Sequence, residues 1–221
     1  MNLPVKTLEV KELEFSSEYP ELDEISGKLD DLNFTNQVDV LNWKSFDYKP
    51  DVKFVIAYTR HELLLKYYVT EQWFKAEMTG TNQEVYEDSC VEFFVSPPGD
   101  GIYYNLEFNA IGTCLMGSGA GRENRKRADP EIISRIRRNG SAGKKSVSEK
   151  IGEFSWTITM AIPFNVFIHH NISGLKGKTF RANFYKCGDK LSVPHYVTWN
   201  PVGTVKPDYH RPEYFGLLKF V

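Results

Sequence analysis

The chain has 221 residues, of which 41% are hydrophobic and 14% aromatic, and it carries a formal net charge of −2. Such a small charge provides no overall attraction to nucleic acid or to an anionic membrane, so we expect neither as a partner. No segment is apolar over the length that crosses a bilayer, so we also expect no membrane insertion. All-β domains are common at this length, and the 15 Phe and 12 Tyr favour strands.

The first 15 residues lack the basic segment and hydrophobic core of an export signal. We therefore expect a cytoplasmic chain if the sequence is complete, and a periplasmic or extracellular one if a leader has been removed. We expect residues 1–221 to form one domain, with residues 1–35 as an N-terminal extension that packs on it.

In chain order, the first expected element is a helix at 21–32, where apolar residues recur at helical spacing. Residues 52–59 and 62–70 predict an antiparallel hairpin, and residues 71–84 predict a polar loop. A short helix is expected at 164–170. Alternation of apolar and polar residues predicts further strands at 91–95, 103–110, 132–138, 153–163, 179–187 and from 214 onward, with a Pro and Gly turn at 96–101.

Three of these strands place polar side chains along one face. In residues 103–110 the two-residue period puts Tyr103, Asn105, Glu107 and Asn109 on the side opposite Leu106 and Phe108. Glu92 in the preceding strand, and Arg181 and Asn183 in 179–187, alternate with apolar residues in the same way. We call Glu92, Glu107, Asn109, Arg181 and Asn183 the polar sheet face, and we expect them to converge. Such a face suits a hydroxyl-rich ligand.

Several segments resemble family-9 carbohydrate-binding modules, in particular their standalone members. The resemblance extends from about Val38 to the C-terminus. The matching segments are KPDVKFVIAYTRHELLLKYYVT at 49–70, DSCVEFFV at 88–95, NLEFNAIG at 105–112, the strand that ends at Pro163, RANFYKCGD at 181–189, and the W-x-P…P-x-x-F-G-x-L pattern at 199–218. Their order and spacing are more specific than any single motif.

The resemblance implies an all-β, two-sheet antiparallel β-sandwich with one or two short helices. It also implies non-catalytic binding of an oligosaccharide or polysaccharide, with one or two sugar units held between loop aromatics and the polar sheet face. A role in polysaccharide catabolism, with xylan among the ligands, would follow. No cofactor is required, although family members hold structural calcium, whose ligands have no fixed spacing here. The metal-ligating residues therefore stay unknown.

Carried onto this chain, the family's two sugar-stacking aromatics fall on Tyr86 and Tyr209, and its motif glutamate and asparagine fall on Glu92 and Asn109. Both aromatics are tryptophan in the xylanase-attached modules, and Glu107 stands where those modules have arginine. We expect Tyr86 and Tyr209 to face each other across a cleft about one pyranose wide. Trp199, or else Trp73, is expected at its rim.

Two other readings stay open. Glu92 and Glu107 on neighbouring strands could be the carboxylate pair of a glycoside hydrolase, since retaining enzymes hold two carboxyl groups about 5–5.5 Å apart. Alternatively, the departures from the family pattern suit a scaffold or interaction domain that has lost sugar binding. The polar side chains could then form an internal salt-bridged lattice, and the loop aromatics could pack on the edge of the core.

The loop at 117–127 combines three glycines with Arg122, Arg125 and Arg127. It lacks the fingerprint of a phosphate-binding loop, so we expect a flexible turn whose arginines are solvated or line a site for an acidic sugar. Cys90, Cys114 and Cys187 show no CxxC pair and the histidines are scattered, which predicts free buried thiols and no zinc motif.

Overall fold

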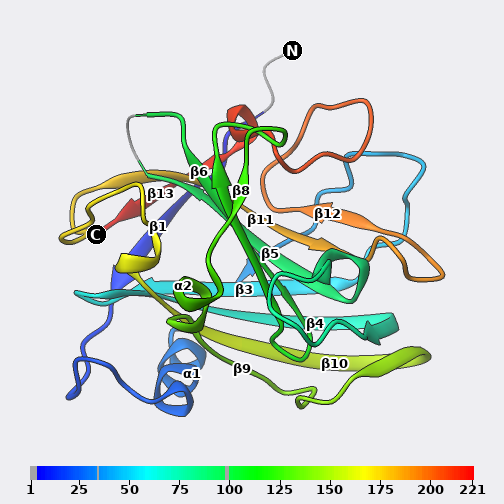
Figure 1. Ribbon diagram of the computed structural model, residues 1–221, viewed down its shortest axis with the longest axis horizontal. Coiled ribbons are helices and arrows are strands. Elements are labelled where there is room, and N and C mark those ends of the chain that lie inside the picture. Colours follow the sequence, from blue (N-terminus) through cyan, green and yellow to red (C-terminus); the bar gives the residue numbers. More distant parts are fainter. Residues whose placement is uncertain (1–3, 34, 98–99) are drawn as a thin grey trace.

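The computed structural model describes residues 4–33, 35–97 and 100–221, and its strands form two sheets packed face to face (Figure 1). The described strands follow one continuous order, β8-β7-β6-β5-β11-β13-β1-β3-β4-β10-β9. We call the part from β8 to β13 the first sheet and the part from β3 to β9 the second; β1 connects them, β12 pairs with β11, and β2 pairs with β3. In chain order the elements are β1 Thr7–Glu12, α1 Leu22–Asp31, β2 Asn36–Gln37, β3 Asp51–Tyr58, β4 Glu62–Ala76, η1 Val85–Glu87, β5 Cys90–Ser96, β6 Tyr103–Asn109, β7 Cys114–Gly119, β8 Lys126–Arg127, α2 Pro130–Ser134, β9 Arg137–Gly140, β10 Val147–Pro163, η2 Phe164–Val166, β11 Thr179–Cys187, β12 Tyr196–Thr198, η3 Pro212–Tyr214 and β13 Gly216–Phe220.

The main core lies between the two sheets and is rich in aromatic rings. Phe184 of β11 stacks on Phe54 of β3 with ring centroids 3.8 Å apart, and on Phe93 of β5 at 5.0 Å. Both sheets therefore contribute to one stack. Full burial of each such ring stabilises the fold by roughly 1.5–3 kcal/mol.

The outer faces of the sheets are covered differently. The helix α1 lies against the outer face of the second sheet (Figure 1), where Ile25 and Leu29 pack with residues of β3, β4 and β10. Loops cover part of the outer face of the first sheet, and they form a second buried cluster with it. Its members are Trp43, Val85, Cys90, Phe94, Tyr103, Leu115, Tyr185, Cys187, Val202, Tyr209 and Phe215.

Much of the predicted strand pattern is confirmed. The helix expected at 21–32 is α1, the hairpin at 52–59 and 62–70 is β3 with β4, and the strand at 179–187 is β11. The turn expected at 96–101 includes residues 98 and 99, which lie outside the described residues. Its flanking strands β5 and β6 pair antiparallel, as a hairpin requires.

Two predictions at the chain's N-terminal side need correction. Residues 7–12 are not an extension packed on the domain, because β1 pairs with β13 through Thr7–Val10 and with β3 through Lys11 and Glu12. Both pairings are parallel, which departs from the antiparallel expectation. β1 thereby passes from one sheet to the other.

Three local predictions were also wrong. Residues 71–76 continue β4 instead of forming a loop, so Trp73 lies in a strand, where its ring packs edge-on against Tyr48. The segment expected as a strand at 132–138 begins in α2. There Asp129 accepts a hydrogen bond from the backbone N–H of Glu131, and Pro130 occupies the first helical turn; both features favour a helix start. Only a 3-10 turn, η2, forms within 164–170.

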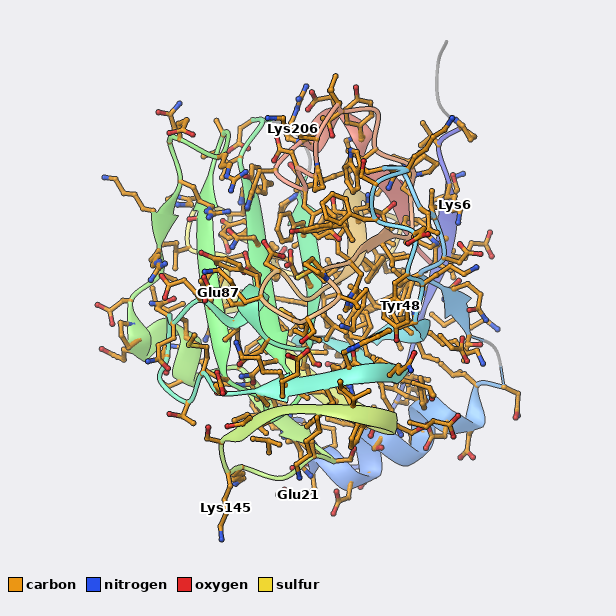
Figure 2. The ribbon with its side chains drawn as sticks, turned by 90° about the vertical axis from the view of Figure 1, so that its right-hand side faces the viewer. Lys6, Glu21, Tyr48, Glu87, Lys145 and Lys206 are labelled. Carbon is orange, nitrogen blue, oxygen red and sulfur yellow. The ribbon has the colours of Figure 1, made fainter. Side chains whose placement is uncertain are left out.

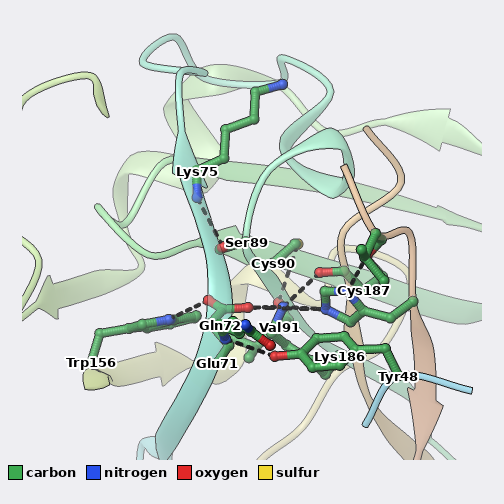
Figure 3. A network of polar contacts seen from close by, with 12 residues as sticks. Tyr48, Glu71, Gln72, Lys75, Ser89, Cys90, Val91, Trp156, Lys186 and Cys187 are labelled. Carbon is green, nitrogen blue, oxygen red and sulfur yellow. Dashed lines mark hydrogen bonds and ion pairs between the residues drawn. The ribbon is translucent and has the colours of Figure 1, made fainter. Parts of the chain in front are cut away.

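A buried ion pair connects the two sheets at the end where β4 meets β11. The Lys186 Nζ lies 2.8 Å from Glu71 Oε2, and neither side chain is exposed to solvent. Trp156 donates its indole N–H to Glu71 Oε1 at 2.6 Å, as Figure 3 shows. Lys186 also donates to the Cys187 carbonyl and to His195 Nε2, both at 2.8 Å. All three ammonium donors are therefore used.

We expect Lys186→Met to lower the free energy of unfolding by about 3–5 kcal/mol, because it leaves the Glu71 carboxylate buried without its cation. Urea unfolding at neutral pH measures this change. Lys190→Met is the matched control, since Lys190 is mostly exposed and pairs with Glu87 at 3.7 Å; it should cost less than about 1 kcal/mol. Equal stability of Lys186→Met and the unaltered protein would contradict the assigned role.

Candidate functional site

A pocket of about 650 Å³, counting solvent at its mouth, opens on the outer face of the first sheet. Its floor comes from β5, β6, β7 and β11, and its walls come from η1 and from three loops. Figure 2 views this side of the molecule and labels Glu87 and Lys206, the sequence neighbours of two lining residues. The lining residues are Tyr86, Glu92, Glu107, Leu115, Arg122, Arg125, Arg127, Cys187, Asp189, Tyr196, Pro207, Asp208, Tyr209 and His210.

Two carboxyl groups meet at the floor of this pocket. Glu92 of β5 is the direct cross-strand neighbour of Glu107 of β6, so both side chains lie on the same sheet face, as the two-residue period predicts. They are 3% and 2% exposed. The Cys187 thiol donates to Glu92 Oε1 at 3.0 Å, and the Asn105 amide donates to Glu107 Oε1 at 2.9 Å. Among the described residues, Glu107 Oε2 has no hydrogen-bond partner.

Burial changes the protonation of these groups. It raises the pKa of Glu107 to about 7, although the Arg125 guanidinium acts in the opposite direction. Burial and the neighbouring Glu107 raise the pKa of Glu92 well above its usual range. Asp189, also a lining residue, has a pKa raised to about 6 by burial. The floor therefore holds protons near neutral pH and can both donate and accept hydrogen bonds.

Three arginines lie above the carboxyl groups. Arg127 pairs with Glu84 at 2.8 Å, whereas Arg122 is 62% exposed and has a carboxylate, that of Asp208, at 3.9 Å. Arg125 contacts the imidazole of His210. Burial, followed by Arg125 and Arg122, lowers the pKa of His210 to about 2, so this ring is neutral. Of the three, Arg125 thus faces an uncharged group.

The two tyrosines expected to stack on sugar both line the pocket, but their surroundings differ. Tyr86 in η1 is partly exposed. Tyr209 is only 7% exposed; its ring stacks on Tyr185 with centroids 4.0 Å apart, and its hydroxyl donates to the Lys186 carbonyl at 3.0 Å. Tyr185 therefore covers one face of Tyr209. That the two rings sandwich a pyranose stays a prediction.

The tryptophans expected at the rim lie elsewhere. Trp199 is 4% exposed and belongs to the main core, where its ring packs edge-on against Phe54 and Phe184. Trp73 packs against Tyr48 and, like Trp199, does not line the pocket. The rim positions expected for the two rings were wrong. Trp199 follows β12 and turns into the core, and Trp73 lies within β4, away from the pocket.

Three members of the polar sheet face also do not line the pocket. The Asn109 amide donates to the Met78 carbonyl and to Asp88 Oδ2. The Asn183 amide donates to the Asn200 carbonyl at 3.0 Å, and Arg181 donates to backbone carbonyls of η3 and the residue after it. These groups hold loops onto the sheet, so only Glu92 and Glu107 converge on the pocket.

Sequence reasoning missed Asp189, Tyr196 and Cys187 as lining residues. Asp189 and Tyr196 line the pocket together with Cys187. The sequence offered one signal, because Cys187 and Asp189 end the segment RANFYKCGD that carries the family resemblance. Tyr196 lies in a short strand within an aromatic-rich loop and gave no pattern.

The raised pKa of Glu107 predicts a pH-dependent stability. Between its ordinary value of 4.5 and about 7, the unfolded chain has lost this proton and the folded chain keeps it. The free energy of unfolding should therefore fall as pH rises through this window, on the order of a few kcal/mol. In Glu107→Gln the fall should be smaller, with Glu92 still contributing.

Thermal unfolding between pH 4.5 and 8, in the presence of a chelator, measures this dependence. Glu153→Gln serves as the control, because Glu153 is exposed on β10. The assignment fails if Glu107→Gln and Glu153→Gln show the same pH profile as the unaltered protein.

Comparison with known proteins places this fold. Among curated proteins none matches the chain. A crystal structure of a Bacteroides uniformis protein, for which carbohydrate binding has been suggested, shares 42% identity, covers 99% of this chain and 100% of its own, and superposes with a TM-score of 0.95. Two structures of a family-9 carbohydrate-binding module from Caldicellulosiruptor kristjanssonii share the fold. The glucose complex shares 13% identity, covers 98% of this chain and 96% of its own, and superposes with a TM-score of 0.59. The cellotriose complex shares 12% identity, covers 97% of this chain and 93% of its own, and superposes with a TM-score of 0.55.

No helix in the described part of the chain is both long and apolar enough to cross a membrane.

The sequence model of carbohydrate-binding family 9 matches residues 24–220. That match includes both sheets and the residues that line the pocket. The chain thus belongs to carbohydrate-binding family 9, a family of non-catalytic binding modules.

Proposed function

We propose that this protein binds carbohydrate, without catalysis, in the pocket over Glu92 and Glu107, and that it holds one or two sugar units there. The observation that carries the proposal is the buried pair of carboxyl groups under partly exposed tyrosine rings, in a chain of a carbohydrate-binding family. The glucose and cellotriose complexes of a module with the same fold support a sugar as the ligand.

The pocket offers a sugar two kinds of contact. Its floor supplies carboxyl oxygens that accept hydrogen bonds from hydroxyl groups, including the unpartnered Glu107 Oε2. The rings of Tyr86 and Tyr196 supply apolar surface for the C–H face of a pyranose. A small open site of this kind gains a few kcal/mol net, which corresponds to a dissociation constant on the order of micromolar to millimolar.

Binding without hydrolysis suits the electrostatics of the carboxyl pair. A glycosidase needs one carboxylic acid and one carboxylate at the same pH. Here burial shifts the pKa of both Glu92 and Glu107 upward, and no cation lies within ion-pair distance of either one among the described residues. Below about pH 7 both groups therefore hold their protons, which leaves no carboxylate to act as the nucleophile.

Calorimetric titration with xylo-oligosaccharides, cello-oligosaccharides and oligo-uronides tests the proposal. Among the described residues Arg125 contacts the neutral His210 ring, and Arg122 is mostly exposed with the Asp208 carboxylate at 3.9 Å. We therefore expect a uronic-acid oligomer to bind at least about tenfold more tightly than its neutral counterpart, and to lose this advantage in high salt. Arg122→Gln should reduce the preference. Arg60→Gln, on an exposed turn between β3 and β4, should not.

The outcomes of this titration separate the alternatives. Equal binding of charged and neutral sugars would reject the acidic preference and keep the sugar site. No binding to any sugar would favour the scaffold reading. Release of aryl alcohol from aryl glycosides, abolished by Glu92→Gln with folding intact, would replace the proposal with a hydrolase.

The two tyrosines should respond differently to truncation. Tyr86→Ala should weaken sugar binding about tenfold or more and leave the thermal midpoint nearly unchanged, because the ring is partly exposed. Tyr209→Ala should lower the free energy of unfolding by about 3 kcal/mol or more, because it removes a ring that is 7% exposed and stacked on Tyr185. Calorimetry and thermal unfolding measure both variants; a destabilised Tyr86→Ala that binds normally would contradict the assignment.

A further inference from the structure

Two cysteines and a glutamate meet below the floor of the pocket. Cys90 of β5 and Cys187 of β11 are direct cross-strand partners, and Glu92 follows two residues after Cys90 on the same face. Their Sγ and carboxylate oxygen atoms lie within 4.8 Å of one another, and all three residues are buried. Cys187 and Glu92 also line the pocket, which gives the cluster a path to solvent.

We propose that Cys90, Cys187 and Glu92 bind one thiophilic divalent cation of the Zn²⁺ type, with its fourth coordination position directed toward the pocket. Two thiolates and one carboxylate form a donor set that Zn²⁺ accepts, whereas Ca²⁺ and Mg²⁺ prefer oxygen alone. This site goes beyond the proposed sugar binding and does not depend on it.

The spacing of the donor atoms fits a tetrahedral ion. With Zn–S near 2.3 Å and Zn–O near 2.0–2.2 Å, neighbouring ligand atoms lie roughly 3.4–3.8 Å apart. The observed donors lie within 4.8 Å, and Cys187 Sγ is 3.0 Å from Glu92 Oε1. The thiol proton now bridges this S···O contact. A cation would take its place after a small movement of both side chains.

A second observation points to a ligand beside the cluster, at an oxygen that the proposed sugar site also uses. Glu107 Oε2 is a buried carboxylate oxygen without a hydrogen-bond partner in the described part of the chain, and Glu107 is only 2% exposed. As the cross-strand neighbour of Glu92, it lies beside the cluster and lines the same pocket. An unpaired buried oxygen is costly, and a cation or its bound water would satisfy it.

Burial opposes ionisation of the two thiols, because it raises the pKa of both Cys90 and Cys187, so a bound cation would have to displace their protons. Metal uptake would release the two thiol protons, and the carboxyl proton where present, to solvent. The nearby cations Arg125 and Lys186 would offset the remaining negative charge.

Metal binding is tested on the full chain, reduced and stripped of metal with a chelator. Zn²⁺ is titrated in competition with a chromophoric chelator, and Co²⁺ is used as a spectroscopic probe. We expect one equivalent of Zn²⁺ to bind, tighter at higher pH, and Co²⁺ to give a thiolate charge-transfer band in the near ultraviolet. Cys187→Ser should weaken Zn²⁺ binding about a hundredfold and reduce the band.

The chain provides its own control in Cys114, a third buried free cysteine outside the cluster. Cys114→Ser should leave both readouts unchanged. Glu92→Gln keeps both thiols, so it tests the site even if a cysteine variant fails to fold; it should weaken Zn²⁺ binding and keep the thiolate band. Sugar titrations are run in parallel on protein kept in chelator. Loss of Zn²⁺ binding is thereby distinguished from loss of sugar binding.

Three outcomes would overturn the proposal. The first is no charge-transfer band although thiol titration shows three free cysteines. The second is an equal loss of Zn²⁺ binding in Cys114→Ser and Cys187→Ser. The third is a disulfide between Cys90 and Cys187. It would have to form in protein purified without reductant and remain after reductant and Zn²⁺ are added.

Discussion

The buried ion pair between Lys186 and Glu71 is the interaction on which both the core and the pocket depend. Burying two charges costs several kcal/mol each, and the cost is offset only when geometry and hydrogen bonds are good. Here Trp156 donates to the carboxylate, and His195 accepts from the ammonium. His195 Nδ1 lies 3.1 Å from the Val193 carbonyl, which fixes the neutral tautomer that leaves Nε2 free to accept. The pair thus joins the sheets at one defined register.

The same residue links the core to the wall of the pocket. Lys186 points into the core, so its neighbours Tyr185 and Cys187 point to the opposite face of β11. The Lys186 carbonyl accepts a hydrogen bond from Tyr209, and Tyr209 stacks on Tyr185. One strand therefore positions a core cation, a pocket thiol and the loop that carries His210. Tyr209 is thus held in the pocket wall by core contacts, whereas Tyr86 in the same pocket is partly exposed.

The sequence predicted what depends on local periodicity. The two-residue period placed Glu92 and Glu107 on one face, and the register confirms it. It could not tell which amides bond to ligand, because Asn109 and Asn183 find their partners in segments distant in sequence. It likewise missed the pairing of Cys90 with Cys187, since motif spacing detects ligands along one segment and not across two strands. Trp199 was misplaced because burial of a loop aromatic is a tertiary property.

The floor of the pocket has one electrostatic requirement, neutralisation of its carboxyl groups, which protons, arginines and a metal ion can meet in different ways. Two buried carboxyl groups side by side are unfavourable when both are charged. Protons remove the charge, Arg125 offsets it from above, and a cation held by the thiols would offset it from below. A neutral sugar can donate hydrogen bonds to the same oxygens but brings no charge. Sugar binding therefore adds to whichever of the other three arrangements neutralises the floor, and it does not replace them.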